Sequence, residues 1–401
     1  MINEATRQYI LAHREEDVKR LALGNREAEV DMSMALQQIA GWQTARKKLP
    51  SWAVVDAIVY PPHLNMEQCS SEQTARYKAG LAGKGHCLVD LTGGFGIDFY
   101  WMSQKFKRRI YVERNAELCD IARHNFQTLG LEAEVICSDG TEYLQQIDHA
   151  DVIFLDPARR DAHGSRTYGI EDCTPNVIEL MPLLLEKADA IILKLSPMLD
   201  WRKAVDDLGH VAEVHIVSVD NECKELLLIV KNGQTEPMSV VCVNNTQEYR
   251  IVPWGGTKRS MGWNKTFHGV EQSVPWGGTN RKVLLFEPNA SIMKAGCFQE
   301  IEESFGVRQL SANSHLFVSD HEVEDFPGRQ FQIETVSSMN KQELKTALQG
   351  ITHANITVRN FPMTVEALRK KLKIKDGGEV YIFATTLSDN SHKLFICRKI
   401  G

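Results

Sequence analysis

Hydrophobic residues recur with two different spacings in the middle of the chain. Between residues 86 and 231, short apolar runs alternate with segments in which apolar residues return every three or four positions. This alternation is typical of a parallel, doubly wound α/β sheet. Two strands lie close together around residues 220–222, which indicates a final antiparallel hairpin. The predicted strands are 86–91, 109–114, 132–139, 151–157, 190–197, 213–219 and 225–231, and the predicted helices are 116–129, 141–147, 175–187 and 201–208.

The segments on either side of this sheet have different patterns. Helical spacing predicts two helices, 4–23 and 26–47, within an N-terminal helical domain of residues 1–70. The sheet domain would then span 71–231. Residues 232–282 lose the alternation and are expected to form a β-rich linker, in which the hexapeptide VPWGGT occurs twice, at 252–257 and 274–279. Two small α+β domains, 283–335 and 336–401, should follow. Their predicted elements are a strand at 282–288, a helix at 290–305, a strand at 355–360, a helix at 364–372 and a hairpin of 379–386 with 393–399.

The first strand of the sheet ends in a glycine-rich turn that leads into a helix. Glycines let a backbone approach a ligand closely, and the free N–H groups of a helix start face that ligand. The turn is not the GxGxxG fingerprint of dinucleotide-binding proteins, and an acid stands on the strand itself, where it would repel pyrophosphate. The acid suits a cationic ligand, such as the aminoacyl end of S-adenosylmethionine (SAM). The candidate residues are Asp90, Thr92, Gly93, Gly94, Gly96 and Asp98.

An acidic residue closes each of the first four strands. Ligands of open α/β sheets bind at the carboxyl ends of the strands, where Asp90, Glu113, Asp139 and Asp156 stand. Glu113, 23 residues after Asp90, suits hydrogen bonds from the ribose hydroxyls. Asp139, after the third strand, suits a hydrogen bond from the adenine amine. Ser70 and Gln73 fit a capping box at the start of the preceding helix, although this helix start could instead line the ligand pocket.

Composition and charge limit the class of protein and the compartment that the chain fits. The 401 residues are 43% hydrophobic and 24% charged, and no apolar run reaches the length that spans a membrane. The nine cysteines are scattered and no metal-ligand spacing occurs, so we expect a reduced, cytoplasmic protein without a metal site. Residues 336–401 hold eleven Lys/Arg and five Asp/Glu, whereas the rest of the chain has a net charge of −12. This asymmetry indicates either a polyanion-binding end or a solvated helix face.

These features resemble the class I SAM-dependent methyltransferases over residues 70–231. The resemblance implies a Rossmann-like seven-stranded sheet and SAM as cofactor. It places the glycine loop around the methionine moiety, Glu113 at the ribose and Asp139 at the adenine, with Arg114 and Gly140 as neighbours of these contacts. Methyl transfer would be an in-line displacement that depends on positioning more than on acid–base groups.

The segment 156–159, Asp-Pro-Ala-Arg, stands where amino-methyltransferases carry Asn/Asp-Pro-Pro-aromatic. The resemblance makes Asp156, Pro157 and Arg159 the catalytic candidates beside the acceptor. Alanine replaces the second proline and arginine the aromatic residue, which argues against methylation of a base amine. Arg159 and Arg160 could instead contact a phosphate, stack on a base or form a salt-bridged loop. Lys194, after the fifth strand, would pair with Asp156 or contact substrate.

Longer segments narrow the resemblance to a bacterial methyltransferase family with a C-terminal THUMP-like domain. They are LTGGFGID, DPARRD, LKLSP, NECKELLL, LFEPNASIMKAG and ITVRNFPMTVEALRKKLKIKDGG. The resemblance makes 283–335 a ferredoxin-like domain and 336–401 the THUMP-like domain, and it implies structured RNA as substrate. The basic cluster of Arg369, Lys370, Lys371, Lys373 and Lys375 agrees with phosphate contacts.

Two other functions compete with an RNA methyltransferase. The altered Asp-Pro-Ala-Arg segment leaves room for a catalytically inactive RNA-binding protein that retains a SAM-binding fold. A nicotinamide-dependent oxidoreductase is disfavoured by Asp90 and by the absence of GxGxxG.

Overall fold

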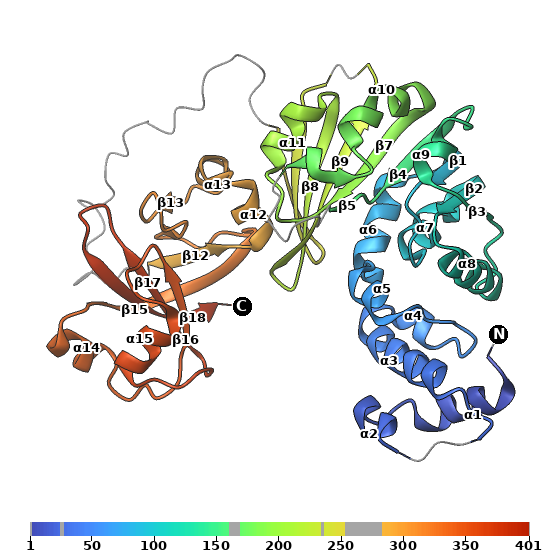
Figure 1. Ribbon diagram of the computed structural model, residues 1–401. Helices are drawn as coiled ribbons and strands as arrows, with labels where there is room; N and C mark the ends of the chain where they lie inside the picture. The colour runs from blue at the N-terminus through green and yellow to red at the C-terminus, as the bar shows by residue number, and fades with distance from the viewer. Residues whose placement is uncertain (1, 25–27, 160–168, 234–235, 253–282, 401) are drawn as a thin grey trace. The chain divides into compact units, whose positions relative to one another are not determined.

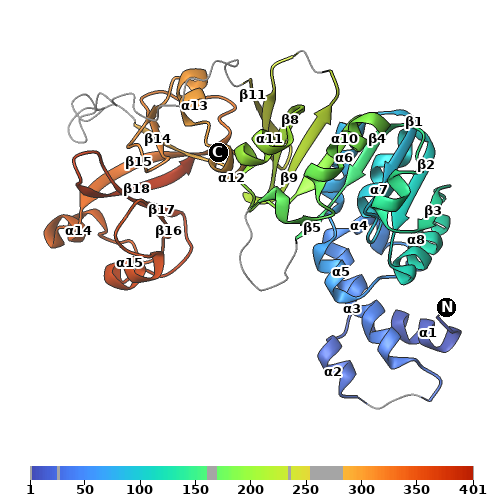
Figure 2. The ribbon, with the colours of Figure 1, turned by 45° about the horizontal axis from the view of Figure 1, so that its top comes forward.

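The computed structural model describes residues 2–24, 28–159, 169–233, 236–252 and 283–400. The chain divides into two compact units (Figures 1 and 2). The first comprises Met1–His215 and Glu225–Met238, and the second comprises Ile216–Lys224 and Ser239–Gly401. The predicted repeat VPWGGT lies outside the described residues, apart from Val252.

The predicted α/β strands are present, and they belong to a nine-stranded sheet with the order β11-β10-β8-β9-β7-β4-β1-β2-β3. Strands β1, β2, β3, β4 and β7 are parallel, and β9 pairs with β7 in the antiparallel sense. Asp220 and Asn221 join β8 to β9 with positive φ angles of 51° and 62°, as a tight hairpin turn requires, which confirms the predicted hairpin. The strands are β1 (Gly85–Asp90), β2 (Phe106–Glu113), β3 (Glu134–Cys137), β4 (Ala150–Leu155), β7 (Ala188–Leu195), β8 (Val211–Val219) and β9 (Glu222–Lys231).

Helices connect the parallel strands, and side-chain caps fix where most of them begin. Asn115, Asp139 and Asn176 each accept a hydrogen bond from a backbone N–H in the first turn of the helix that follows. A buried cluster that includes Phe99, Tyr111 and Phe126 packs between helices and sheet and stabilises this arrangement. The helices are α6 (Glu72–Ala82), α7 (Ile97–Met102), α8 (Ala116–Thr128), α9 (Gly140–Leu144), α10 (Val177–Lys187) and α11 (Trp201–Leu208).

The N-terminal segment is helical, but the predicted single helix 4–23 is wrong. It consists of α1 (Glu4–His13) and α2 (Val18–Ala22), because Asp17 adopts an extended backbone and its side chain accepts a hydrogen bond from Arg20 N. The next predicted helix begins later than expected, at Met32. Figure 1 shows α6 leading from this helical segment to β1. The remaining helices are α3 (Met32–Lys48), α4 (Pro50–Ala53) and α5 (His63–Gln68).

The second unit is built on a seven-stranded sheet with the order β13-β14-β12-β15-β18-β17-β16. Its central strand β15 pairs with β12 on one side and with β18 on the other. The predicted hairpin of β17 with β18 is confirmed. The strands are β12 (Leu284–Pro288), β13 (Arg308–Gln309), β14 (Phe317–Ser319), β15 (Gly328–Ser338), β16 (Asn355–Arg359), β17 (Val380–Thr386) and β18 (His392–Ile400). This unit also contains the antiparallel hairpin of β10 (Ser239–Asn244) and β11 (Gln247–Ile251).

In the described part of this unit, four helices accompany the second sheet. The predicted helix 290–305 is two helices, because Gly296 takes a left-handed conformation (φ 67°) that ends the first of them. In both views α14 and α15 lie beside β16, β17 and β18 (Figures 1 and 2). The helices are α12 (Ala290–Ala295), α13 (Phe298–Phe305), α14 (Lys341–Ala347) and α15 (Val365–Leu372). Among the described residues, no helix is both long and apolar enough to cross a bilayer.

Candidate cofactor and acceptor site

The glycine turn between β1 and α7 is held by backbone hydrogen bonds on both sides. Gly93 N donates to Val112 O at 2.9 Å, and Gly96 N donates to Gly93 O at 2.9 Å. Gly94 and Gly96 have positive φ angles of 55° and 84°, and a Cβ on Gly93 would lie 2.2 Å from the Tyr111 ring. The turn therefore requires glycine, both for its backbone conformation and for its close approach to β2.

Asp90 lies under this turn at the end of β1. Its side chain is buried, and Oδ1 accepts a hydrogen bond from Thr92 N at 2.9 Å. Burial raises the pKa of the Asp90 carboxyl well above its ordinary value, the Thr92 N–H lowers it, and nearby Asp98, Asp156 and Glu113 raise it further.

Glu113 and Asp139, the acids at the ends of β2 and β3, also accept hydrogen bonds from backbone N–H groups. Glu113 accepts from Gly94 N at 2.9 Å and from Asn115 N at 2.8 Å, which ties the end of β2 to the glycine turn. Asp139 caps α9, and the hydrogen bond from the Thr141 hydroxyl is the main reason why its pKa is lowered. A Cβ on Gly140 would lie 2.1 Å from Leu91 O. The loops after β1, β2 and β3 thus meet at one edge of the sheet, while Arg114 beside them is exposed.

The end of β4 is fastened to the glycine turn and to β7. Asp156 N donates to the Thr92 hydroxyl at 2.7 Å, and the Asp156 carboxylate forms an ion pair with Lys194. Pro157 is buried behind it. The chain then enters β5 (Ala158–Arg159), which pairs with β6 (Cys173–Thr174). Arg160 lies outside the described residues, and the side chain of Arg159 is not described.

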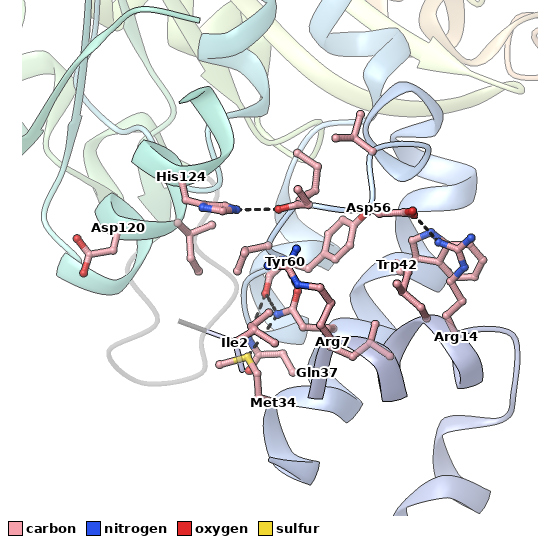
Figure 3. A pocket seen from close by; sticks show the side chains of 18 of the residues that line it. Ile2, Arg7, Arg14, Met34, Gln37, Trp42, Asp56, Tyr60, Asp120 and His124 are labelled. Atoms are coloured by element: carbon pink, nitrogen blue, oxygen red, sulfur yellow. Dashed lines mark hydrogen bonds and ion pairs between the residues drawn. The ribbon is translucent and has the colours of Figure 1, made fainter. Parts of the chain in front are cut away.

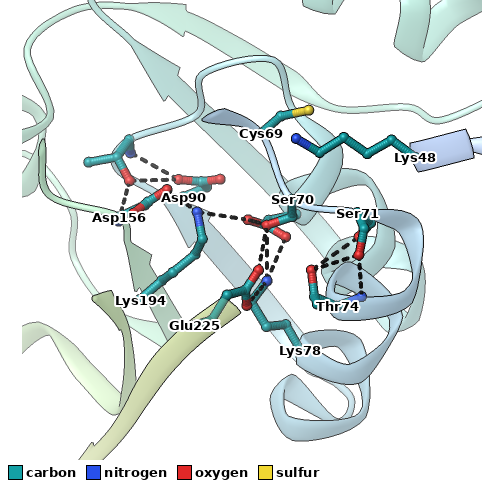
Figure 4. A network of polar contacts seen from close by, with 12 residues as sticks. Lys48, Cys69, Ser70, Ser71, Thr74, Lys78, Asp90, Asp156, Lys194 and Glu225 are labelled. Atoms are coloured by element: carbon teal, nitrogen blue, oxygen red, sulfur yellow. Dashed lines mark hydrogen bonds and ion pairs between the residues drawn. The ribbon is translucent and has the colours of Figure 1, made fainter. Parts of the chain in front are cut away.

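A buried charge network continues inward from Lys194 (Figure 4). Lys194 Nζ lies 3.9 Å from Asp98 Oδ2, and Lys78 Nζ lies 3.1 Å from Asp98 Oδ1. Lys78 also forms an ion pair with Glu225 and donates to the Ser70 hydroxyl at 3.0 Å. The Lys78 ammonium thus donates hydrogen bonds to Ser70 and Glu225 and lies within ion-pair distance of Asp98, which compensates for its complete burial.

The expected capping box at Ser70 is wrong. Ser71 caps α6 by accepting from Thr74 N, so the capping position is one residue later than expected. Ser70 instead lies within hydrogen-bond distance of Asp98 Oδ2 (2.8 Å) and Glu225 Oε1 (3.0 Å), and its hydroxyl proton serves one of them. The start of this helix therefore contributes to the polar network, and its expected place in the ligand pocket stays a prediction.

Sequence reasoning missed Lys78 and Glu225 as members of this network. Both carry a weak signal, since Glu225 precedes the apolar run of β9 and Lys78 stands on the sheet-facing side of α6. Burial and attraction by Lys78 and Lys194 compete at Glu225, and its pKa is lowered overall. A charged residue at the edge of a buried strand needs a partner of opposite charge, because an unpaired buried charge is unfavourable. The sequence alone does not identify that partner.

A separate cavity of about 590 Å³ lies in the first unit, between the N-terminal helices and α8 (Figure 3). Its lining includes Met34, Tyr60 and His124 and none of the residues predicted to bind the cofactor. Arg14 pairs with Asp56 at its rim at 2.8 Å. The cofactor candidates and this cavity are therefore different features of the unit.

The second unit carries the basic cluster on and after α15. Lys370, Lys371, Lys373 and Lys375 are exposed, and none forms an ion pair with any residue in the described part of the chain. Arg369 differs from them, because its guanidinium pairs with Asp376 at 2.7 Å and donates to Ala354 O at 3.2 Å. Its main contacts are therefore structural.

Comparisons with known proteins match both units. Residues 284–327 match a ferredoxin-like domain and residues 328–399 a THUMP domain-like family. An uncharacterized SAM-dependent methyltransferase of Mycobacterium tuberculosis H37Rv is 21% identical over 344 residues, which cover 83% of this chain and 87% of that protein. A Porphyromonas gingivalis W83 protein whose crystal structure is assigned as a methyltransferase is 32% identical, with a TM-score of 0.84 over all of both chains.

The α/β sheet, the glycine turn and these relatives all indicate the same class of enzyme. The protein is a SAM-dependent methyltransferase with S-adenosylmethionine as its cofactor. The chain belongs to the family of class I methyltransferases that carry C-terminal ferredoxin-like and THUMP-like domains.

Proposed function

We propose that the protein transfers a methyl group from SAM to a nucleotide of a structured RNA. The observation that carries the RNA part is the group of four exposed lysines, 370, 371, 373 and 375, within the THUMP-like segment. Lysines without acidic partners among the described residues are available to phosphates, and they bind without reading sequence. THUMP-like domains connect this surface to RNA by analogy.

SAM would bind across the glycine turn, with its methionine part beside Asp90. Three carboxylates, those of Asp98, Asp156 and Glu225, are paired with only two ammonium groups, those of Lys78 and Lys194, and Asp90 lies near them. The excess of negative charge favours a cation, and SAM carries an ammonium and a sulfonium. Glu113, at the same edge of the sheet, keeps lone pairs free for the ribose hydroxyls. Thr92, Gly93, Gly94, Gly96, Arg114, Asp139 and Gly140 complete the proposed cofactor site.

The acceptor would lie beside Asp156, the outermost carboxylate of the network. Its side chain is 39% exposed, so one oxygen can accept a hydrogen bond from the acceptor while the other stays with Lys194. Bound SAM would supply the methyl group and its sulfur would keep the electron pair of the broken carbon–sulfur bond, while the proton that the acceptor loses would pass to the Asp156 carboxylate. Pro157 fixes the backbone at this point, and Arg159 and Arg160 are proposed to face a phosphate or base of the RNA.

Two observations favour the second candidate function, an RNA-binding protein without catalysis. Asp156 is already engaged by Lys194, and Ala158 stands where related amino-methyltransferases have a proline. Such a protein would bind SAM and its demethylated product almost equally and would methylate no RNA.

The test is incubation of the purified protein with methyl-labelled SAM and total bacterial RNA. The proposal predicts label in RNA with wild-type protein and none with Asp156→Ala, and it predicts that SAM affinity is unchanged in that variant. Lys203→Met removes an exposed, paired lysine elsewhere in the first unit and serves as the matched control. Micromolar SAM binding without label in any RNA would support the second candidate instead.

A further inference from the structure

The charges between the interior and the acceptor edge of the first unit alternate in sign. From inside to outside they are Glu225, Lys78, Asp98, Lys194 and Asp156, and each neighbouring pair lies within ion-pair distance. The inner members are buried, with Lys78 completely enclosed, whereas Asp156 is partly open to solvent. The chain of charges joins α6, α7, β7 and β9 to the loop after β4.

We infer that Lys78 is a positioning residue for the acceptor site, acting through Asp98 and Lys194 on Asp156. The inference rests on the proposed function, in which Asp156 faces the acceptor. Lys78 itself touches neither the glycine turn nor Asp156. Lys78 is completely buried and its ammonium contacts Ser70, Glu225 and Asp98, so its influence on a ligand is indirect.

Competition for Lys194 is the physical basis of this influence. Lys194 Nζ is closer to Asp156 than to Asp98, from which it is separated by 3.9 Å, because Lys78 already neutralises Asp98 from the other side. Without the charge on Lys78, Asp98 would attract Lys194 more strongly and loosen its pair with Asp156. Without the charge on Glu225, Lys78 would pair with Asp98 alone, and Lys194 would pair more strongly with Asp156.

Replacing Lys78 and replacing Glu225 with uncharged residues should therefore shift the pKa of Asp156 in opposite directions. Burial raises the pKa of the Asp156 carboxyl, Lys194 offsets part of that rise, and Asp98 and Glu225 add to it. The groups facing it are thus Lys194 on β7, Asp98 on α7, Glu225 on β9 and Asp90 on β1. Lys78→Met should raise the pKa of Asp156, and Glu225→Gln should lower it.

The experiment is a carbon NMR titration of the full chain labelled at aspartate side-chain carboxyls, with neither SAM nor RNA present. The Asp156 signal is identified by its loss in Asp156→Asn. Opposite shifts in Lys78→Met and Glu225→Gln, with no shift in Lys203→Met, are the expected result. Shifts of the same sign, or none in variants with native near-UV circular dichroism, would overturn the inference.

Two features keep this test decisive. If Lys78→Met does not fold, Glu225→Gln still tests the inference, because Lys78 keeps Asp98 as a partner in that variant. Because the titration needs no SAM and no RNA, its failure is distinct from failure of the proposed function. Once methylation is measured, the acidic limb of the kcat/KM profile should shift with the same two signs, while KM for SAM stays the same.

Discussion

The backbone N–H of Asp156 donates to the side-chain hydroxyl of Thr92 at 2.7 Å, across a sequence distance of 64 residues. This bond joins the glycine turn that faces the cofactor to the loop proposed to face the acceptor. Thr92 also donates toward Asp90 Oδ1 at 3.4 Å. One side chain therefore links the two halves of the site.

Removing that hydroxyl should loosen the site. Thr92→Val leaves the partly buried Asp156 N–H without its acceptor, which costs about 1–3 kcal/mol. Urea unfolding measures this loss, and Thr92→Ser, which keeps the hydroxyl, should lose less than about 1 kcal/mol. Equal losses in the two variants would mean that the methyl group, rather than the hydrogen bond, matters at this position.

The raised pKa of Asp90 makes SAM binding depend on pH. The free protein holds a proton on this carboxyl above the ordinary aspartate pKa of about 3.9, whereas an ammonium partner requires the carboxylate. SAM affinity should therefore increase as pH rises toward the raised pKa, with release of up to one proton per SAM bound. Calorimetry below about pH 7, in buffers of different ionisation enthalpy, measures that proton, because the SAM α-amino group stays charged there.

The same shift has a consequence for stability. A folded-state pKa above the unfolded value means that the folded protein binds more protons, so this group lowers stability as pH rises from about 4 through the raised pKa. Asp90→Asn should remove both this dependence and the proton released on SAM binding. Unchanged proton release in that variant would assign the proton to another group.

Gly93 should tolerate no side chain. A Cβ there would lie 2.2 Å from one carbon of the buried Tyr111 ring and 2.4 Å from the next, so either the ring or the turn must move. Gly93→Ala should cost about 1–3 kcal/mol of stability and reduce SAM affinity at least tenfold in a binding titration. Gly80→Ala is the matched control, because nothing lies within 4 Å of its Cβ and alanine favours a helix by about 0.5–1 kcal/mol. Similar losses in both variants would contradict this account.

The exposed lysines on and after α15 should govern the salt dependence of RNA binding. Replacing Lys370, Lys371, Lys373 and Lys375 with glutamine should weaken binding to structured RNA and reduce the slope of log affinity against log salt by up to about 3. A charge-matched control changes four exposed lysines of the first unit, Lys19, Lys84, Lys105 and Lys107. Equal slopes in the two variants would mean that net charge, rather than this surface, attracts RNA.

Local patterns predicted the part of the site that lies in one continuous segment. The strand Gly85–Asp90, the glycine turn and α7 follow one another in the chain, and their spacing alone indicates a ligand loop. The acids at the ends of β2, β3 and β4 were also predictable, because parallel strands bring their carboxyl ends to one edge. The helix breaks at Asp17 and Gly296 were missed, since single capping residues override apolar periodicity there.

The contacts that the sequence could not predict are the distant ones. Lys78 and Glu225 are 147 residues apart, and only the folded sheet brings α6 beside β9. Likewise, the sequence did not predict that the ferredoxin-like and THUMP-like segments share one sheet, in which β15 pairs with β12 of the first segment and β18 of the second. Such pairings depend on the tertiary arrangement, which neither hydrophobic period nor residue type specifies.

The most direct test of the proposed site is calorimetric titration with SAM of the wild-type protein and of Glu113→Ala, with NADH as the control ligand. The account predicts micromolar SAM binding to the wild type, no binding of NADH, and loss of SAM binding in Glu113→Ala while the near-UV circular dichroism stays native. Unchanged SAM affinity in the folded Glu113→Ala protein would contradict the placement of the cofactor at the glycine turn.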